Sequence, residues 1–201
     1  MTKNEIKAGD RIKFGHFKPQ TRSSDDMDLI WRILDVSDDS VLLLCDKLIA
    51  NLPYNKAEGQ ITWKYCTLRQ WLNIDFRAAA FSPAENSSLI ESHTGEESDL
   101  VFILSRDEIE KYLSDEVKRN DNKGGLMQKL DRVAQPLRKR SAPNEYWWVR
   151  DVVYQDARFG SMLEHIDTSG YYGRTPSYCE RWVRPACRVK LSALLPSMLM
   201  R

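Results

Sequence analysis

Alternating hydrophobic and polar positions mark the first third of the chain as β-structure. Polar and apolar residues alternate over residues 11–15, as they do in a half-buried strand. Two apolar runs follow at residues 29–36 and 41–45, and the turn-forming sequence SDDS at 37–40 separates them. This pattern predicts a β-hairpin over residues 29–45.

The middle of the chain carries helix signals. Thr67, Ser82 and Ser105 each stand three residues before a Gln or Glu, which fits the capping box at a helix start. After Thr67, apolar residues recur at helical spacing, so we expect Trp71 to pack on a sheet. Residues 100–104 (LVFIL) indicate a buried strand. Strands, then helices, then strands predict an α+β fold, in a single domain over residues 1–201.

The segment 114–144 is polar and irregular, and we interpret it as a loop insertion in which residues 126–137 could form a short helix. After Tyr146 short β-segments return at residues 147–150, 159–166 and 183–191. Loops are expected between them.

Composition excludes several function classes. The chain has 201 residues, 42% hydrophobic and 29% charged, with a net charge of +1, so no global field attracts nucleic acid. No apolar run reaches the roughly 20 residues that span a bilayer, so no membrane insertion is expected. The polar start of the chain does not resemble a signal peptide. The four cysteines are therefore expected to be free thiols in a reducing compartment.

Motifs for chemistry are lacking. His16, His93 and His165 are far apart, and the sequence contains no metalloprotease, phosphate-binding or nucleophile motif. No pair of carboxylates stands out for acid–base work. The sequence therefore predicts no metal, no cofactor and no enzymatic activity.

Seven segments, in order, resemble one family. They include residues 12–20 (IKFGHFKPQ), 62–73 (TWKYCTLRQWLN), 80–85 (AFSPAE), 101–105 (VFILS), 147–150 (WWVR) and 183–186 (VRPA). The family is a group of bacterial and phage domains of unknown function, similar to C-type-lectin-like folds and distantly to formylglycine-generating enzymes. The resemblance implies small mixed and antiparallel sheets, two to three helices and long loops. It also implies a cytoplasmic or phage-associated protein.

Four residues of the matching segments are expected to stabilise the fold: Trp147, Trp148, Arg150 and Arg184. The guanidinium groups of the two arginines are expected to bind loop carbonyls or carboxylates. Two positions depart from the family pattern. Residues 151–152 are Asp-Val where the family usually has Ser-Pro, and Trp182 replaces a glycine.

Some C-type-lectin-like proteins of this kind are targets of diversity-generating retroelements, which change adenine-containing codons for an exposed binding face. Residues 151–187 are rich in Tyr, Arg, Asp, Ser and Gly and contain no Lys. This is the composition that mutation of adenines in Asn codons would produce. The alternative, that this chain is a loop-rich member of the family whose gene is not diversified, has nearly equal weight. We expect a ligand-binding surface over residues 151–182, with these contact residues: Asp151, Tyr154, Asp156, Arg158, Tyr171, Tyr172, Arg174, Tyr178, Arg181 and Trp182.

Three functions stay open. The first is binding of a protein or glycan ligand, without the calcium signature of lectins, which is absent. The second is a formylglycine-generating-type oxidase, for which the resemblance would require Cys179 and Cys187 to hold copper. The third is a structural component of a phage or bacterial particle.

Overall fold

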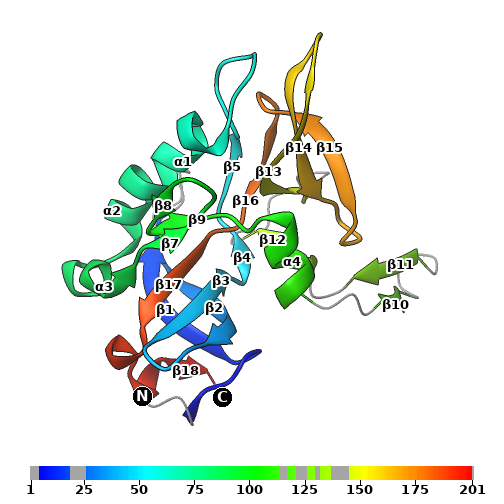
Figure 1. The fold of residues 1–201 in the computed structure, drawn as a ribbon. Helices are drawn as coiled ribbons and strands as arrows, with labels where there is room; N and C mark the ends of the chain where they lie inside the picture. Colours follow the sequence, from blue (N-terminus) through cyan, green and yellow to red (C-terminus); the bar gives the residue numbers. More distant parts are fainter. Residues whose placement is uncertain are drawn as a thin grey trace. The chain divides into compact units, whose positions relative to one another are not determined.

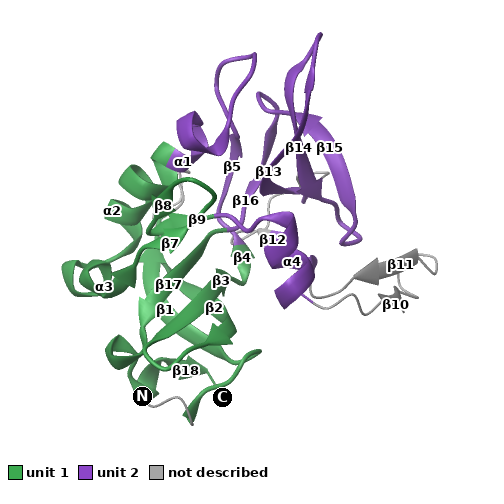
Figure 2. Ribbon diagram, in the orientation of Figure 1, with its two compact units in different colours: residues 1–47, 70–102, 185–201 green, residues 48–69, 103–184 purple. Residues whose placement is uncertain are grey.

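The computed structural model describes residues 5–18, 26–113, 117–120, 126–129, 132–136 and 145–200 (Figure 1). The chain divides into two compact units (Figure 2). Unit 1 comprises residues 1–47, 70–102 and 185–201, and unit 2 comprises residues 48–69 and 103–184. Each unit is assembled from stretches far apart in the sequence, so no single cut would separate them. The single-domain interpretation stays a prediction beside this division.

Helices and mainly antiparallel sheets make up the described chain, which confirms the α+β prediction. Unit 1 holds a sheet in the order β18-β1-β2-β3-β17-β6, with β9 also paired to β17, and a small β7–β8 ladder. The strands are β1 (Arg11–Phe17), β2 (Met27–Val36), β3 (Ser40–Cys45), β6 (Leu89–Ile90), β7 (Ser92–His93), β8 (Ser98–Asp99), β9 (Val101–Phe102), β17 (Ala186–Lys190) and β18 (Leu199–Met200). The antiparallel pair β2–β3 confirms the predicted hairpin.

Short helical segments lie between and after these strands in the sequence. They are α1 (Thr67–Trp71), the π-helical turn Leu72–Phe76, α2 (Arg77–Ala80) and α3 (Pro83–Ser88), followed near the C-terminus by the 3₁₀ turns Leu191–Ala193 and Pro196–Met198. The ring of Trp71 meets Phe17 of β1 edge-on with centroids 6.5 Å apart, which confirms that Trp71 packs on the sheet. Gly15 has a φ of 72°, and a Cβ there would come within 2.6 Å of the Ala80 carbonyl oxygen. Only glycine fits this crossing of β1 and α2.

Two of the three predicted capping boxes are confirmed. Ser82 with Glu85 and Ser105 with Glu108 form reciprocal side chain–backbone hydrogen bonds at the starts of α3 and α4 (Arg106–Tyr112). The prediction for Thr67 is wrong, because Thr67 is already the first residue of α1, and its hydroxyl accepts the N–H of Lys56 (3.1 Å). The sulfur of Cys66 accepts the N–H of Arg69 instead (3.4 Å) and caps α1.

Unit 2 is built on a five-stranded sheet in the order β15-β14-β13-β16-β5. Its strands are β5 (Ala50–Pro53), β13 (Trp147–Asp156), β14 (Gly160–Ile166), β15 (Tyr172–Pro176) and β16 (Glu180–Val183), with a 3₁₀ turn at Trp63–Tyr65. The expectation of loops across residues 151–182 is therefore corrected to regular strands joined by short turns. Two register shifts in β13, between residues 148 and 154, break the alternation that would have revealed this strand.

The predicted loop insertion at 114–144 also contains strands. β10 (Val117–Asn120) pairs antiparallel with β11 (Leu126–Lys129), and β12 (Gln135–Pro136) pairs with β4 (Lys47–Leu48). The expected short helix at 126–137 is wrong for residues 126–129. A four-residue run is too short for its periodicity to distinguish strand from helix. Residues 114–116, 121–125, 130–131 and 137–144 lie outside the described residues. Among the residues described, no helix is long and apolar enough to cross a bilayer.

Candidate functional site

Two buried tryptophans anchor β13, the central strand of the unit 2 sheet. Trp147 and Trp148 are both fully buried, and their indole N–H groups donate to the carbonyl oxygens of Arg132 (3.0 Å) and Leu52 (2.8 Å). Arg184 is buried as well, with its guanidinium 5.2 Å from the centre of the Trp147 ring and bonded to the Arg132 carbonyl (3.5 Å). These contacts confirm the predicted bracing role of Arg184.

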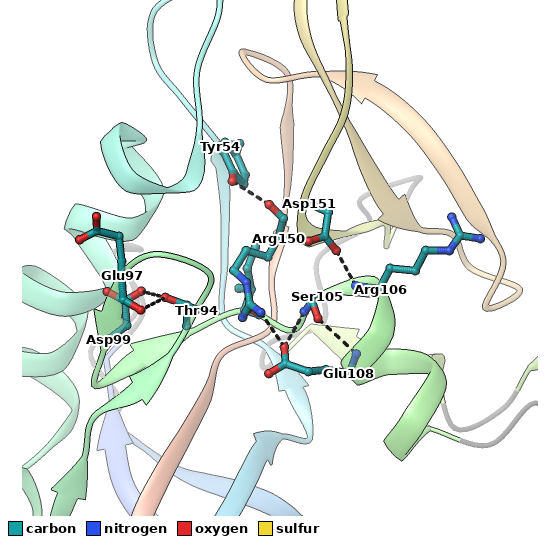
Figure 3. A network of polar contacts seen from close by, with 10 residues as sticks. Tyr54, Thr94, Glu97, Asp99, Ser105, Arg106, Glu108, Arg150 and Asp151 are labelled. Carbon is teal, nitrogen blue, oxygen red and sulfur yellow. Dashed lines mark hydrogen bonds and ion pairs between the residues drawn. The ribbon is translucent and has the colours of Figure 1, made fainter.

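The start of α4 is held against β13 by polar contacts (Figure 3). Arg150 donates to the Ile103 carbonyl oxygen (2.9 Å) and pairs with Glu108 (3.0 Å), which confirms its predicted tie to a carbonyl and a carboxylate. The Asp151 carboxylate accepts the N–H of Arg106 (2.6 Å), the first residue of α4. Asp151 was expected to contact a ligand, and in the structure its carboxylate fixes this helix.

One face of the β13–β14–β15 sheet gathers tyrosine and arginine side chains. The register pairs Tyr154 with Met162, Glu164 with Arg174 and Ile166 with Tyr172. Because side chains alternate between the faces of a strand, Tyr154, Glu164, Tyr172 and Arg174 lie on the same face. Arg106 joins them from α4. We call these five residues the tyrosine–arginine face.

Arginine side chains lie over both tyrosine rings of this face. The Arg174 guanidinium is 5.8 Å from the centre of the Tyr154 ring, and that of Arg106 is 4.0 Å from the centre of the Tyr172 ring. Arg106 also forms ion pairs with Glu164 and, at 3.0 Å, with Glu110. Tyr154 is 42% exposed and Arg174 is exposed, so the outer part of the face is open to solvent.

Burial sets the electrostatics of the inner part. Glu164 is only 3% exposed, and burial raises the pKa of its carboxyl above the usual value, although Arg106 and Arg174 act in the opposite direction. Burial also raises the pKa of Tyr172 to about 12, so this phenol is neutral at physiological pH. The face therefore presents the phenol of Tyr154 and the guanidinium of Arg174 to solvent, whereas the hydroxyl of Tyr172 is buried and the Glu164 carboxyl is held by Arg106.

Exposed residues also mark the two turns that flank β14. At the β13–β14 turn, Asp156 accepts the N–H groups of Arg158 (2.8 Å) and Phe159 (3.0 Å), and both of these side chains are exposed. At the β14–β15 turn, Tyr171 is 39% exposed and its N–H donates to Asp167 (3.0 Å). Asp156 thus shapes a turn, whereas the side chains of Arg158 and Tyr171 are exposed to solvent.

The other face of the same sheet is mostly buried. His165 and Thr175 lie on this face, and Arg181 of β16 donates to the Thr175 hydroxyl (2.9 Å). Burial, followed by the nearby Arg181 charge, lowers the pKa of His165 to about 4. Trp182 is only 9% exposed, and Tyr178 is half-buried beyond the end of β15.

The structure thus brings together Tyr154, Tyr172 and Arg174 among the predicted contact residues, and it places Arg181 and Trp182 elsewhere. Sequence reasoning missed Arg106 and Glu164. Arg106 comes from a helix that is distant in sequence, and nothing in the linear pattern connects it to β14.

The family comparison covers all of unit 2, with the candidate site, and part of unit 1. A family described as "Domain of unknown function (DUF6273)" matches residues 38–191. The chain belongs to this family. No curated protein matches the chain, and no solved structure matches it. The DUF6273 match confirms the expected membership of a family of unknown function.

The four cysteines of this DUF6273 chain are free thiols. Burial raises the pKa of Cys66 to about 12 and that of Cys187 further, whereas Cys179 is half-buried. A copper-binding cysteine acts as a thiolate. The buried Cys187 thiol is poorly suited to that role. Within the described ranges, no group of three or more His, Cys, Asp or Glu side chains could hold a metal ion.

Proposed function

We propose that this chain is a ligand-binding protein whose recognition surface is the tyrosine–arginine face, extended by Arg158, Phe159 and Tyr171 at the flanking turns. One observation carries the proposal. Of the eight large hydrophobic side chains that are exposed among the described residues, four lie within residues 153–171: Val153, Tyr154, Phe159 and Tyr171. Large exposed apolar side chains are typical of interaction sites, and these four lie on β13 or on the turns at the two ends of β14, Phe159 before this strand and Tyr171 after it.

The residue types suit recognition of a protein or a glycan. Tyrosine offers a large contact area for little loss of conformational entropy, and tyrosine and arginine are common at binding hot spots. The sheet supplies rigidity, because Arg106 is tied to Glu164 and its backbone to Asp151. A preorganised surface loses less entropy when a ligand binds.

We further propose a C-type-lectin-like scaffold, with diversification of the surface. Small sheets, short helices and one parallel strand pair support the scaffold. Tyr154, Arg158, Tyr171 and Arg174, which adenine mutagenesis can produce, are exposed. Of the residues that it cannot produce, Glu164 and Trp182 are buried and Met162 is half-buried, whereas Gln155 and Glu180 are exposed. A neighbouring reverse transcriptase gene and a near-identical template repeat would support diversification, and invariant codons at these positions among near-identical genes would contradict it.

The binding proposal is tested by screening the full chain against a glycan array and a displayed peptide library. Any ligand obtained is then titrated against a Tyr154→Ala, Arg174→Ala double variant. We expect a loss of affinity of about tenfold or more, since interface aromatic and arginine residues dominate binding. Tyr65→Ala is the matched control, because Tyr65 is a 65% exposed tyrosine of the same unit outside this face.

An equal effect of both variants, or no selected ligand in either screen, would overturn the recognition surface. The alternative role as a particle component predicts self-association of the purified chain, which light scattering measures.

A further inference from the structure

β15 (Tyr172–Pro176) forms one edge of the five-stranded sheet of unit 2 (Figure 1). On its inner side it pairs with β14 in one unbroken antiparallel register, from Tyr172 opposite Ile166 to Pro176 opposite Met162. On its outer side no strand pairs with it among the described residues. An edge strand of this kind offers a row of backbone groups to a further strand.

The hydrogen bonds at the two ends of β15 show which of its backbone groups point outward. The Asp167 N–H donates to the Tyr171 carbonyl (2.9 Å), and the Ser177 N–H donates to the Ser161 carbonyl (3.0 Å). Hydrogen-bonded and non-hydrogen-bonded pairs alternate along an antiparallel ladder. The odd-numbered residues from 171 to 177 therefore bond to β14, and the even-numbered residues direct their N–H and C=O groups away from it.

The outward-facing backbone groups of β15 are free. Those of Tyr172 and Arg174 have no hydrogen-bond partner among the residues described. Pro176 stands at the next outward position, where the missing N–H of proline costs no bond to β14. Gly173 is half-exposed and Arg174 is exposed, so solvent reaches this edge.

β5, at the opposite edge of the sheet, is less suited to pairing. The Leu52 carbonyl oxygen accepts the indole N–H of Trp148 (2.8 Å), and the strand ends at Pro53, which has no N–H to donate. Natural edge strands are commonly protected by such features. The open edge is therefore the one that borders the tyrosine–arginine face.

Arg174 adds a positive charge to the open edge. Arg106 on the same face forms ion pairs with Glu164 and Glu110. Among the described residues, no carboxylate lies within ion-pair distance of Arg174, whose exposed guanidinium lies 5.8 Å from the centre of the Tyr154 ring. The side chain opposite Arg174 on an added strand would have its Cβ about 5 Å away. A carboxylate at that position can pair with the guanidinium.

We propose that the partner of the tyrosine–arginine face is an extended peptide with an acidic side chain, which adds to β15 as a further strand. Such a peptide uses the recognition surface proposed above, on which this inference rests, and the free edge favours a peptide over a glycan. Its backbone bonds to the N–H and C=O groups of Tyr172 and Arg174, and its carboxylate pairs with Arg174. In strand addition, backbone hydrogen bonds give affinity and side-chain contacts give specificity.

A second copy of the chain fits this edge less well. If two β15 strands paired antiparallel through the outward groups of both Tyr172 and Arg174, Arg174 of one copy would lie opposite Tyr172 of the other. The Tyr172 ring already has the guanidinium groups of Arg106 and Arg132 at 4.0 Å and 5.3 Å from its centre. That register brings like charges together, which disfavours pairing. An acidic peptide brings the opposite charge.

The test uses two pools of peptides of about seven residues, built from threonine, valine, isoleucine and tyrosine, with a central glutamate in one pool and a central glutamine in the other. NMR of the full chain follows hydrogen exchange at the backbone amides of Tyr172 and Arg174. We expect the strongest binder of the glutamate pool to slow both by about tenfold or more at saturation. It should bind about threefold more tightly than its glutamine counterpart.

Methylation of the peptide nitrogens, one at a time, tests the strand geometry without any change in the protein. Only alternate amides of an added strand can face β15. Methylation at every second position should therefore weaken binding by about three- to tenfold, because a backbone hydrogen bond is lost. At the intervening positions the Kd should stay within about twofold.

Variants of Arg174 separate the charge from the backbone. Arg174→Gln should remove the preference for glutamate and retain slow exchange of the residue 174 amide. Arg174→Pro also removes the outward N–H, and it should weaken binding further, since an edge strand tolerates proline where the N–H faces solvent. Lys56→Gln is the matched control, because Lys56 is an exposed cation of the same unit outside β15, and binding should be unchanged.

Strand addition would be overturned if neither pool binds, if bound peptide leaves exchange at Tyr172 and Arg174 fast, or if methylation shows no alternation. Slow exchange that depends on protein concentration alone would assign the edge to a second copy. The recognition surface fails separately. A peptide or glycan whose affinity falls in the Tyr154→Ala, Arg174→Ala variant without slowing these amides would keep that surface and remove only the added strand.

Discussion

The imidazole of His165 lies flat against the ring of Tyr146, with centroids 4.9 Å apart and an interplanar angle of 7°. The Arg181 guanidinium lies 5.6 Å from the centre of the same Tyr146 ring. The stack therefore holds a neutral, 6% exposed histidine close to a positive charge. Protonating His165 would add a second charge to this buried face, which explains why its pKa falls to about 4.

Stability should fall between neutral and acidic pH because of His165. In the unfolded chain its pKa returns to the ordinary 6.5, so between pH 6.5 and about 4 the unfolded state binds a proton that the folded state does not. The contribution of neutral His165 to the free energy of unfolding is complete above pH 6.5. About 3 kcal/mol of this contribution is lost by pH 4. Urea unfolding between pH 4.5 and 7.5 measures it, and His165→Gln should show a smaller slope. Identical slopes would contradict this assignment.

Gly173→Ala should destabilise the sheet. A Cβ at residue 173 would overlap Nε2 of His165, and the stacked imidazole has no room to withdraw. We expect a loss of about 1–3 kcal/mol in the free energy of unfolding, as for other overpacked sites. In a His165→Ala background the same change should cost less than about 0.5 kcal/mol, because the obstacle is gone. An equal cost in both backgrounds would show that the backbone, rather than His165, requires glycine.

Arg106 and Glu164 should respond unequally to mutation. Burial raises the pKa of Glu164, so the charged carboxylate opposes folding and its stability contribution is lost as pH rises. Glu164→Gln at pH 7 should therefore change stability by less than about 1 kcal/mol. Arg106→Met removes the ion pair of Arg106 with the Glu164 carboxylate and its contact with the Tyr172 ring. We expect the free energy of unfolding to fall by about 1–2 kcal/mol.

Chemical denaturation of the two variants and of the Arg106→Met, Glu164→Gln double variant measures the coupling. The double variant should be more stable than Arg106→Met alone. A double variant that is less stable than either single variant would contradict the account of Glu164 as a buried charge held by Arg106.

The sequence predicted correctly those elements that depend on residues close together in the chain. The β2–β3 hairpin follows from an apolar pattern and a four-residue turn, and the caps at Ser82 and Ser105 depend on residues three positions apart. The cap of α1 was missed because the helix begins one residue earlier than the pattern implied, with Cys66 before it, and the Thr67 hydroxyl accepts the N–H of Lys56, eleven residues earlier. A capping pattern cannot reveal such a competitor.

The candidate site was only partly predictable. Tyr154, Tyr172 and Arg174 stood out by residue type, and the strand register decides that they share a face. Arg181 belongs to the same sequence segment, yet its side chain crosses the other face to Thr175. The bulges in β13 also shift which residues of that strand point to each side, so alternation alone does not assign Tyr154 to its face.

Thiol labelling should separate Cys179 from the other three cysteines. Cys45, Cys66 and Cys187 are buried, and burial raises the thiol pKa of Cys66 and Cys187, which suppresses the reactive thiolate. With a disulfide reagent at pH 8, we expect one fast-reacting thiol in the folded protein and four in denaturant. Cys179→Ser should remove the fast reaction, whereas Cys66→Ser, the control, should retain it.

The same experiment bears on the formylglycine-generating-type alternative, in which Cys179 and Cys187 would bind copper together. That role requires both thiols to be reactive in the folded chain. Protection of Cys187 would be incompatible with it, since Cys187 is fully buried in β17 of unit 1. Equal labelling rates for Cys179 and Cys187 would contradict the burial described here and would favour the oxidase over the binding protein.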